Sequence, residues 1–174
     1  AWDMVTAAAF PTAILTAAYG LLEMGRLRAG EVVVIHSAAG GVGSTAVQIA
    51  HAMGAVVVGT AGSDKKLPVL EALGCRMAMN YKTTDWAGRV HDELGGADLI
   101  FDALGGQYLK DGYSLLNPNG RLVSYGLGTM TPAGGRPNWF KLAWQFIRLP
   151  RFSIFPMISD VRTVGGFNVL LLWD

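Results

Sequence analysis

A glycine-rich turn, Ser37 to Gly43 (SAAGGVG), is the part of this sequence best suited to hold an anion. The run before it, Val32–Ile35, is continuously β-branched, which is typical of a strand buried on both faces. From Ser44 to Gly54 apolar residues recur at helical spacing. A turn from a buried strand into a helix N-terminus presents free N–H groups and the positive end of the helix dipole. The segment therefore predicts a binding site for a pyrophosphate group.

The glycine pattern alone is a weak signal. Ala38 takes the first position of G-x-G-x-x-G and is followed by Gly40 and Gly43. That pattern also suits a tight strand-to-helix turn that binds nothing. The context favours a dinucleotide site, because the motif follows a buried strand and opens an amphipathic helix.

The end of the second predicted strand, in "VGTAGSDKK", indicates which dinucleotide would bind. An NAD site has an acid about twenty residues after the glycines, to hold the ribose hydroxyls. Here Thr60 and Gly62 stand at that point, and Ser63, Lys65 and Lys66 follow. Hydroxyl donors and positive charge suit a 2′-phosphate, so we expect NADPH rather than NADH. The alternative is that the two lysines form a solvated helix face.

Strands and helices alternate along the rest of the chain, after an Ala-rich N-terminal helical segment. We expect caps at Thr83 or Thr84 and at Asp64. The helices are expected at 44–53, 65–74, 83–94 and 107–116. The strands are expected at 32–35, 55–60, 77–81, 97–106, 120–128 and 163–173. This order predicts an α/β fold: a Rossmann doubly wound parallel sheet of about six strands in a three-layer αβα arrangement.

Composition places the chain among compact intracellular domains. It has 174 residues, 51% of them hydrophobic, and a formal charge of +1, which gives no reason to expect nucleic acid as a partner. Cys75 is the single cysteine, so we expect no disulfide framework and a cytoplasmic location. No apolar run reaches the length of a membrane span.

The residues that could hold a metal are few. His36, His51, His91 and Cys75 stand at spacings that fit neither a zinc finger nor an H-E-x-x-H motif, so the sequence predicts no metal site. We expect His36 to be a packed structural residue at a strand end. No side chain suggests itself as a catalytic acid, and Tyr125 is expected to be a packed ring.

Several motifs in order carry a family resemblance: "LTAAYGLLEMGRLRAGEVVVIHSAAGGVGSTAVQIAHAMGAVVVGTAGSDKK", "GADLIFDALGG", "LLNPNGRLVSYG" and "VGGFNVLLLWD". Together they resemble the zinc-free quinone oxidoreductase branch of the medium-chain dehydrogenase/reductase superfamily, in particular its VAT-1 homologues. Enoyl-thioester reductase domains of polyketide and fatty-acid synthases also carry "HSAAGGVG" and are an alternative.

The resemblance implies cofactor contacts at the ends of successive strands. The pyrophosphate turn is matched by Ala39, Gly40, Gly41 and Val42. The positions that receive the 2′-phosphate are matched by Gly62, Ser63, Lys66 and Tyr81. The nicotinamide ribose loop and the next strand end are matched by Leu104, Gly105, Gly126 and Leu127. The nicotinamide itself is approached in relatives by residues that match Thr16, Phe167 and Asn168.

The resemblance also implies an activity: NADPH-dependent, metal-free hydride transfer to a quinone or an activated alkene. Relatives carry an N-terminal GroES-like catalytic domain and a final C-terminal segment that nothing here resembles. Residues 1–174 are therefore expected to be the NADP-binding domain with an N-terminal helix, inactive by itself. Relatives dimerise through the last strand, so a homodimer is expected.

One segment, "RPNWFKLAWQFIRLPRF", interleaves aromatic and basic residues. We expect a helix from Asn138 to Pro150 that is apolar over most of its circumference. Residues 138–152 would suit contact with a membrane surface, which would make the protein peripheral to membranes. They would equally suit a surface that covers substrate or packs on another domain. The competing hypothesis is that the protein is not catalytic. It would keep the dinucleotide-binding site and use residues 138–152 to bind lipid or another protein.

Overall fold

A computed structural model of the chain describes residues 3–128 and 149–171. Six parallel strands in this part form one sheet in the order β3-β2-β1-β4-β5-β6. The strands are β1 (Val32–Ile35), β2 (Val56–Ala61), β3 (Met77–Asn80), β4 (Ala97–Asp102), β5 (Leu116–Ser124) and β6 (Thr163–Gly166). The order reverses between β1 and β4, which is the switch point where doubly wound sheets bind ligands. The predicted fold class is confirmed.

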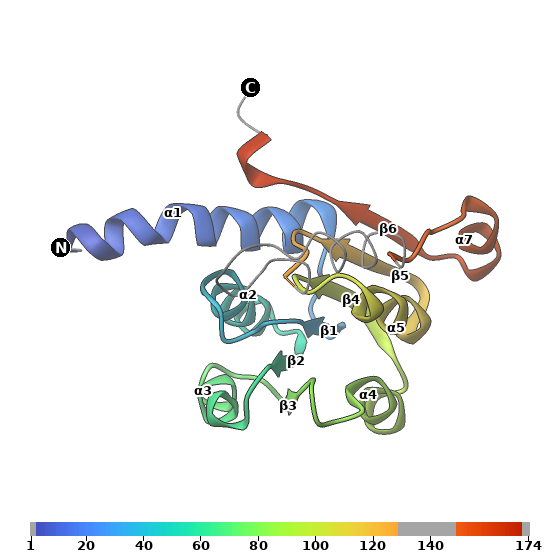
Figure 1. Ribbon diagram of the computed structural model, residues 1–174, viewed down its shortest axis with the longest axis horizontal. Helices are drawn as coiled ribbons and strands as arrows, with labels where there is room; N and C mark the ends of the chain where they lie inside the picture. The colour runs from blue at the N-terminus through green and yellow to red at the C-terminus, as the bar shows by residue number, and fades with distance from the viewer. Residues whose placement is uncertain (1–2, 129–148, 172–174) are drawn as a thin grey trace, which may run out of the picture.

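Helices cover both faces of this sheet. The helical elements of the described residues are α1 (Met4–Ala18), the π-helix η1 (Tyr19–Met24), α2 (Gly41–Ala52), the 3₁₀ turn η2 (Asp64–Lys66), α3 (Leu67–Ala72), α4 (Trp86–Leu94), α5 (Gln107–Leu115), α7 (Ile154–Asp160) and the 3₁₀ turn η3 (Val169–Leu171). Figure 1 shows α2 and α3 on one side of the sheet and α4 and α5 on the other. The arrangement has three layers, α, β and α.

The strand residues alternate between two cores, as the pleat of a strand requires. Val33 and Ile35 of β1 pack with residues of α1, α2 and α3, whereas Val34 packs with residues of α4 and α5. All three side chains are fully buried. A strand covered on both faces has no polar side, which explains the unbroken Val-Val-Val-Ile sequence.

The N-terminal helix is joined to the sheet through η1. A Cβ atom on Gly20 would lie 2.3 Å from the ring of Phe101 in β4 and 3.0 Å from the ring of Phe167. Glycine at this position therefore lets the π-helix backbone lie directly against the two aromatic rings. This contact brings α1 and η1 close to the ends of β4 and β6.

Three predicted strands have clearly different bounds in the structure. The fourth ends at Asp102 instead of 106, because the loop amides of Leu104 and Gly105 bond to the Asp102 side chain and not to a neighbouring strand. The fifth begins at Leu116 instead of 120 and ends at Ser124, after which the Tyr125 amide donates to Asp102 O. The sixth stops at Gly166 instead of 173, because β5 offers it partners only from Arg121 to Ser124. Beyond that point Asn168 accepts the amide of Leu170 and the chain turns into η3.

The predicted helix starts also need correction. Helix α2 begins at Gly41 rather than Ser44, so part of the glycine cluster belongs to its first turn. The cap of α4 is Asp85, whose Oδ1 accepts the Gly88 amide at 3.1 Å, and neither threonine before it. Asp64 lies inside η2 and accepts a hydrogen bond from Asn80 Nδ2 at 2.8 Å, so it is no cap.

The predicted aromatic helix at 138–150 lies outside the described residues except for its last two positions. Among the described helices, none is both long and apolar enough to cross a membrane.

Candidate functional site

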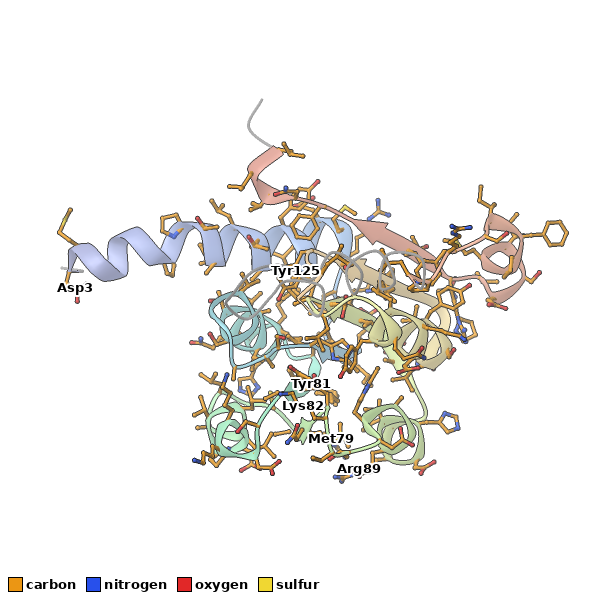
Figure 2. All side chains as sticks on the ribbon, in the orientation of Figure 1. Asp3, Met79, Tyr81, Lys82, Arg89 and Tyr125 are labelled. Atoms are coloured by element: carbon orange, nitrogen blue, oxygen red, sulfur yellow. The ribbon has the colours of Figure 1, made fainter. Side chains whose placement is uncertain are left out.

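The predicted cofactor residues that follow the strands lie at the carboxyl edge of the sheet in two groups, and Thr16 belongs to α1. The β1–β3 group follows the first three strands and consists of Ala39, Gly40, Gly41, Val42, Gly62, Ser63, Lys66 and Tyr81. The β4–β6 group follows the other three strands and consists of Leu104, Gly105, Gly126, Leu127, Phe167 and Asn168. In Figure 2, Tyr81 and Lys82 lie well apart from Tyr125, which marks the second group.

Most of the β1–β3 group lines a pocket of about 350 Å³, whereas Gly41 and Val42 lie in the first turn of α2 outside its lining. Its lining is drawn from the turn after β1, the end of β2 with the residues that follow it, and the loop after β3. The lining residues are Ser37, Ala39, Gly40, Ala61, Gly62, Ser63, Lys66, Tyr81 and Lys82. Predicted residues from three separate segments thus meet at one pocket that contains no carboxylate in its lining.

The turn at this pocket is tight and its geometry requires glycine. Ser37 has a φ of +52°, and its carbonyl accepts the Gly40 amide at 2.8 Å. A Cβ atom on Gly43 would lie 2.3 Å from Ser37 O and 2.7 Å from Ala38 Cα, both of them backbone atoms. This glycine therefore lets α2 pack directly on the turn that follows β1.

Helix α2 offers its N-terminus to the pocket. Gly40 is the N-cap residue, it makes no side-chain cap, and the first turn contains no acidic residue. A Cβ atom on Gly41 would meet nothing within 4 Å, so the space beside the helix start is open. Backbone N–H groups and the helix dipole at such an end attract an anion.

Two lysines line the pocket from different segments. Lys66 ends η2 and Lys82 follows β3, and both side chains are exposed. Between them, Gly62 lies so close to its neighbours that a Cβ atom there would be 2.6 Å from the Tyr81 hydroxyl oxygen and 3.3 Å from Lys82 Cε. Lys82 was not among the residues predicted from the sequence, although it directly follows Tyr81 in "NYKTT".

His36 is a buried residue directly after β1, beneath the pocket-lining turn, and contacts β2. The side chain is fully buried, and its Nδ1 lies 2.8 Å from the Thr60 hydroxyl oxygen. The ring makes edge contacts with Trp86 at 4.6 Å and Tyr108 at 5.7 Å between centroids. Burial lowers the pKa of His36 to about 3, so the imidazole is neutral at physiological pH. His36 is a core residue, as expected.

The β4–β6 group is organised around Asp102, which was not predicted from the sequence either. This side chain is fully buried, and its two carboxylate oxygens accept the amides of Leu104 at 3.1 Å and Gly105 at 2.9 Å. Burial raises the pKa of Asp102, and the two amide hydrogen bonds oppose that rise. An acid at a strand end just before the pair Gly105–Gly106 was the signal that could have revealed it.

Other members of this group contact one another or residues beside the strand ends. Gly105 lies against the Leu127 side chain, because a Cβ atom on it would be 2.6 Å from Leu127 Cδ2. The Phe167 amide donates to Ser124 O at 3.1 Å, and its ring is 5.1 Å from the ring of Tyr19. These contacts bring the ends of β4, β5 and β6 together.

Thr16, predicted to approach the nicotinamide, and Tyr125, expected to be a packed ring, both make contacts within the protein. The Thr16 hydroxyl donates to Thr12 O at 2.7 Å within α1. The Tyr125 ring stacks on Phe101 at 4.5 Å, and burial together with the nearby Asp102 charge raises the pKa of its hydroxyl. A phenol with a raised pKa is a weaker proton donor, which agrees with Tyr125 as a packed ring.

Metal ligands are not gathered anywhere in residues 3–128 and 149–171: no three His, Cys, Asp or Glu side chains lie close enough together to hold an ion. Cys75 is buried, and burial raises the pKa of its thiol to about 12.

Comparison with known proteins gives a family match. Residues 41–164 match the family model described as "Zinc-binding dehydrogenase". The "Synaptic vesicle membrane protein VAT-1 homolog" of Danio rerio is 35% identical over 94% of this chain and 34% of its own length. A phenolphthiocerol/phthiocerol polyketide synthase of Mycobacterium tuberculosis is 41% identical over 69% of this chain and 6% of its own length. This chain thus spans only a minor part of either relative.

Two solved structures are similar in both sequence and fold. The quinone oxidoreductase from Thermus thermophilus, whose structures include a complex with NADPH, is 31% identical with a TM-score of 0.72, over 96% of this chain and 48% of that one. The nucleotide-binding subdomain of the enoylreductase domain of PpsC from Mycobacterium tuberculosis is 30% identical with a TM-score of 0.74, over 92% of this chain and 81% of that one.

Proposed function

This chain belongs to the zinc-binding dehydrogenase family within the medium-chain dehydrogenase/reductase superfamily, and on that basis we propose that it binds NADPH for an oxidoreductase. The reaction we propose is metal-independent hydride transfer to a quinone or an activated alkene. The observation that carries the proposal is the pocket of the β1–β3 group, which joins a helix N-terminus to two lysines.

The lining of this pocket supports NADPH over NADH. Lys66 and Lys82 supply positive charge, and Ser63 and Tyr81 supply hydroxyl donors. A 2′-phosphate needs such groups, whereas the ribose hydroxyls of NADH need an acid at the end of β2. The acidic residue next to this segment, Asp64, accepts a hydrogen bond from Asn80 and does not line the pocket.

Each part of the edge would have its own task in binding. The first turn of α2 would hold the pyrophosphate with backbone N–H groups, and the lysines would hold the 2′-phosphate. The loops of the β4–β6 group would orient the nicotinamide end through backbone atoms near Leu104, Gly105 and Phe167. The bound cofactor would supply the hydride.

The proton that completes the reduction is assigned to water or to another domain of the natural-length protein. Tyr125 is a poor donor because its raised pKa makes the phenol a weaker acid, and its ring is stacked on Phe101. Replacing it should support this assignment: Tyr125→Phe should leave the reduction rate within about twofold of the unaltered protein. A loss of about a hundredfold or more would instead make Tyr125 the donor.

The experiment that tests this function uses the natural-length protein with NADPH and a panel of quinones and enones. The expected result is oxidation of NADPH that depends on one of these substrates and persists after treatment with a chelator. Loss of the rate on chelation, with recovery on adding zinc, would contradict metal independence. Failure to bind NADPH would contradict the whole proposal.

An enoyl-thioester reductase is the second candidate, because the similar PpsC structure is described as the nucleotide-binding subdomain of an enoylreductase domain. Both candidates reduce an activated double bond with the same domain. Comparing kcat/KM for an α,β-unsaturated thioester and for a simple quinone distinguishes them. A large advantage for the thioester would favour the synthase type.

A surface role is the third candidate, favoured by α7. Ile154, Phe155 and Ile158 of this helix are 75%, 80% and 70% exposed, and they follow directly on residues 138–152. A similar protein is called a synaptic vesicle membrane protein, which makes peripheral membrane contact a reasonable test. Absence of co-sedimentation with anionic liposomes would contradict it.

We also propose a homodimer through β6. This strand is the last in the described sheet and pairs with β5 alone. An outer strand can pair with its copy in a second chain. Light scattering that gives the mass of a single chain would contradict this proposal.

A further inference from the structure

Asp102 is a buried acid at the carboxyl edge of the sheet, and its side chain is bonded to the loop that follows β4. It ends β4, the strand beside the switch point, and its side chain is 0% exposed. Oδ1 accepts the amide of Leu104 at 3.1 Å and Oδ2 accepts the amide of Gly105 at 2.9 Å. One carboxylate therefore fixes two successive backbone amides of the loop that follows the strand.

The loop after β4 contains two glycines, so its conformation must be fixed by contacts with other groups. Gly105 and Gly106 have φ values of +72° and +60°, so two adjacent residues lie in the left-handed region. Glycines reach this region without strain but also have the most alternatives to it. Because both oxygens of the Asp102 carboxyl group accept loop amides, this side chain selects the loop conformation that directs both amides toward it.

The same residue connects the loop to the end of β5. The Ser124 hydroxyl lies 3.3 Å both from Asp102 Oδ2 and from Gly126 O. The Tyr125 amide donates to Asp102 O at 3.0 Å, and the Gly128 amide donates to Ala103 O at 2.8 Å. The loops after β4 and β5 are thus linked by both the side chain and the backbone around Asp102.

We propose that Asp102 is a positioning residue that holds the loops at 103–106 and 125–128 in the conformation that receives the nicotinamide end of NADPH. The inference rests on the proposed NADPH function. Asp102 does not line the pocket of the β1–β3 group. Its loss should therefore weaken contacts with the nicotinamide half of the cofactor and leave the adenosine half unaffected.

The test compares two ligands and two aspartates in the natural-length protein. NADPH reaches both groups, whereas 2′,5′-ADP reaches the β1–β3 group alone. The matched control is Asp98, on the same strand at the opposite edge, where it accepts the Val32 amide at 2.8 Å and Asn117 Nδ2 at 3.1 Å. We expect Asp102→Asn to weaken NADPH about tenfold and 2′,5′-ADP less than about twofold, and Asp98→Asn to change neither.

A second variant tests the same point without touching the carboxylate. Gly105→Ala places a Cβ atom 2.6 Å from Leu127 Cδ2 at a φ that disfavours alanine, so it should displace the same loop. Its effect should follow that of Asp102→Asn, and it provides the test if Asp102→Asn fails to fold. Circular dichroism of each variant checks the fold.

The possible failures are distinguishable. Equal weakening of both ligands, or no change in NADPH affinity, would overturn the positioning role and leave the proposed function standing. Binding of neither ligand by the unaltered protein would overturn the proposed function together with this inference.

Discussion

At the ends of β1, β2 and β3 polar groups surround an open pocket, whereas at the ends of β4, β5 and β6 they are paired with one another. The first half has a helix N-terminus without a side-chain cap and two exposed lysines. In the second half the buried Asp102 accepts two loop amides, and the Phe167 amide is bonded to β5.

This contrast shows how one sheet edge can serve the two ends of an asymmetric ligand. Phosphates carry charge, so a site for them keeps donors and cations facing solvent until the ligand arrives. A neutral ring is placed by shape and by backbone groups, so its site needs loops that are fixed beforehand. Substitutions in the β1–β3 group should therefore weaken phosphate binding. The strongest effect is expected in the turn after β1, where the backbone is most closely packed.

Replacing Gly43 should damage the first half most. In Gly43→Ala the new Cβ atom would lie 2.3 Å from Ser37 O, and the backbone of the turn must shift. We expect a loss of about 2 kcal/mol in the free energy of unfolding and about a hundredfold in NADPH affinity. Urea unfolding and calorimetry measure the two effects.

The control for that variant is Gly41→Ala, where nothing lies within 4 Å of the new Cβ atom. It should leave the free energy of unfolding unchanged within about 0.5 kcal/mol. Equal destabilisation by both variants would show that the close approach of α2 to the turn is not what glycine provides.

Removing a cation from the pocket should separate the two dinucleotides. Lys66→Ala takes one positive charge from the pocket lining, so NADPH affinity should fall about tenfold while NADH affinity stays within about twofold. Lys65→Ala is the matched control, since Lys65 is exposed but does not line the pocket. The same loss from both variants would mean that only general charge matters.

Acid should destabilise the fold through His36. Its folded pKa of about 3 lies below its ordinary value of 6.5, so between these values the unfolded chain binds a proton that the folded chain does not. Stability should therefore decrease as the pH falls through this window, by up to about 1.4 kcal/mol per pH unit. His36→Phe should remove this part of the slope in pH-dependent urea unfolding, whereas the exposed His91→Gln should keep it. An unchanged slope in His36→Phe would contradict the burial of a neutral imidazole.

The smallest effect is expected at Lys82. Its side chain lies along Gly62 beside Tyr81, so Lys82→Ala should weaken NADPH about threefold, and less so at high salt. Titrations at two salt concentrations would measure this. A larger loss than that of Lys66→Ala would make Lys82 the main phosphate contact.

Most of the fold could be predicted from the sequence, because buried parallel strands are continuous apolar runs and glycines mark the turns between them. The limits of β4, β5 and β6 could not, since each of these strands ends where its pairing with the neighbouring strand ends. The cap at Asp85 was missed because three polar residues in a row, Thr83, Thr84 and Asp85, offer equivalent side-chain oxygens.

The candidate site likewise contains residues that local sequence patterns predict and residues that only the fold reveals. Most of the β1–β3 group could be predicted because its glycines form a strand–turn–helix motif and because Ser63 and Lys66 directly follow the next strand. Tyr81 came only from the family resemblance. Lys82 depends on how the loop after β3 folds back toward Gly62, which no local pattern encodes. Asp102 was missed because an acid at a strand end is usually solvated, and only the fold shows that this one is buried among its own loop amides.

The most direct test of the central claim is calorimetric titration of the unaltered protein with NADPH and with NADH under the same conditions. A pocket lined by two lysines and no carboxylate predicts that NADPH binds at least about tenfold more tightly. Equal affinity for the two, or tighter binding of NADH, would contradict the assignment of this pocket to a 2′-phosphate.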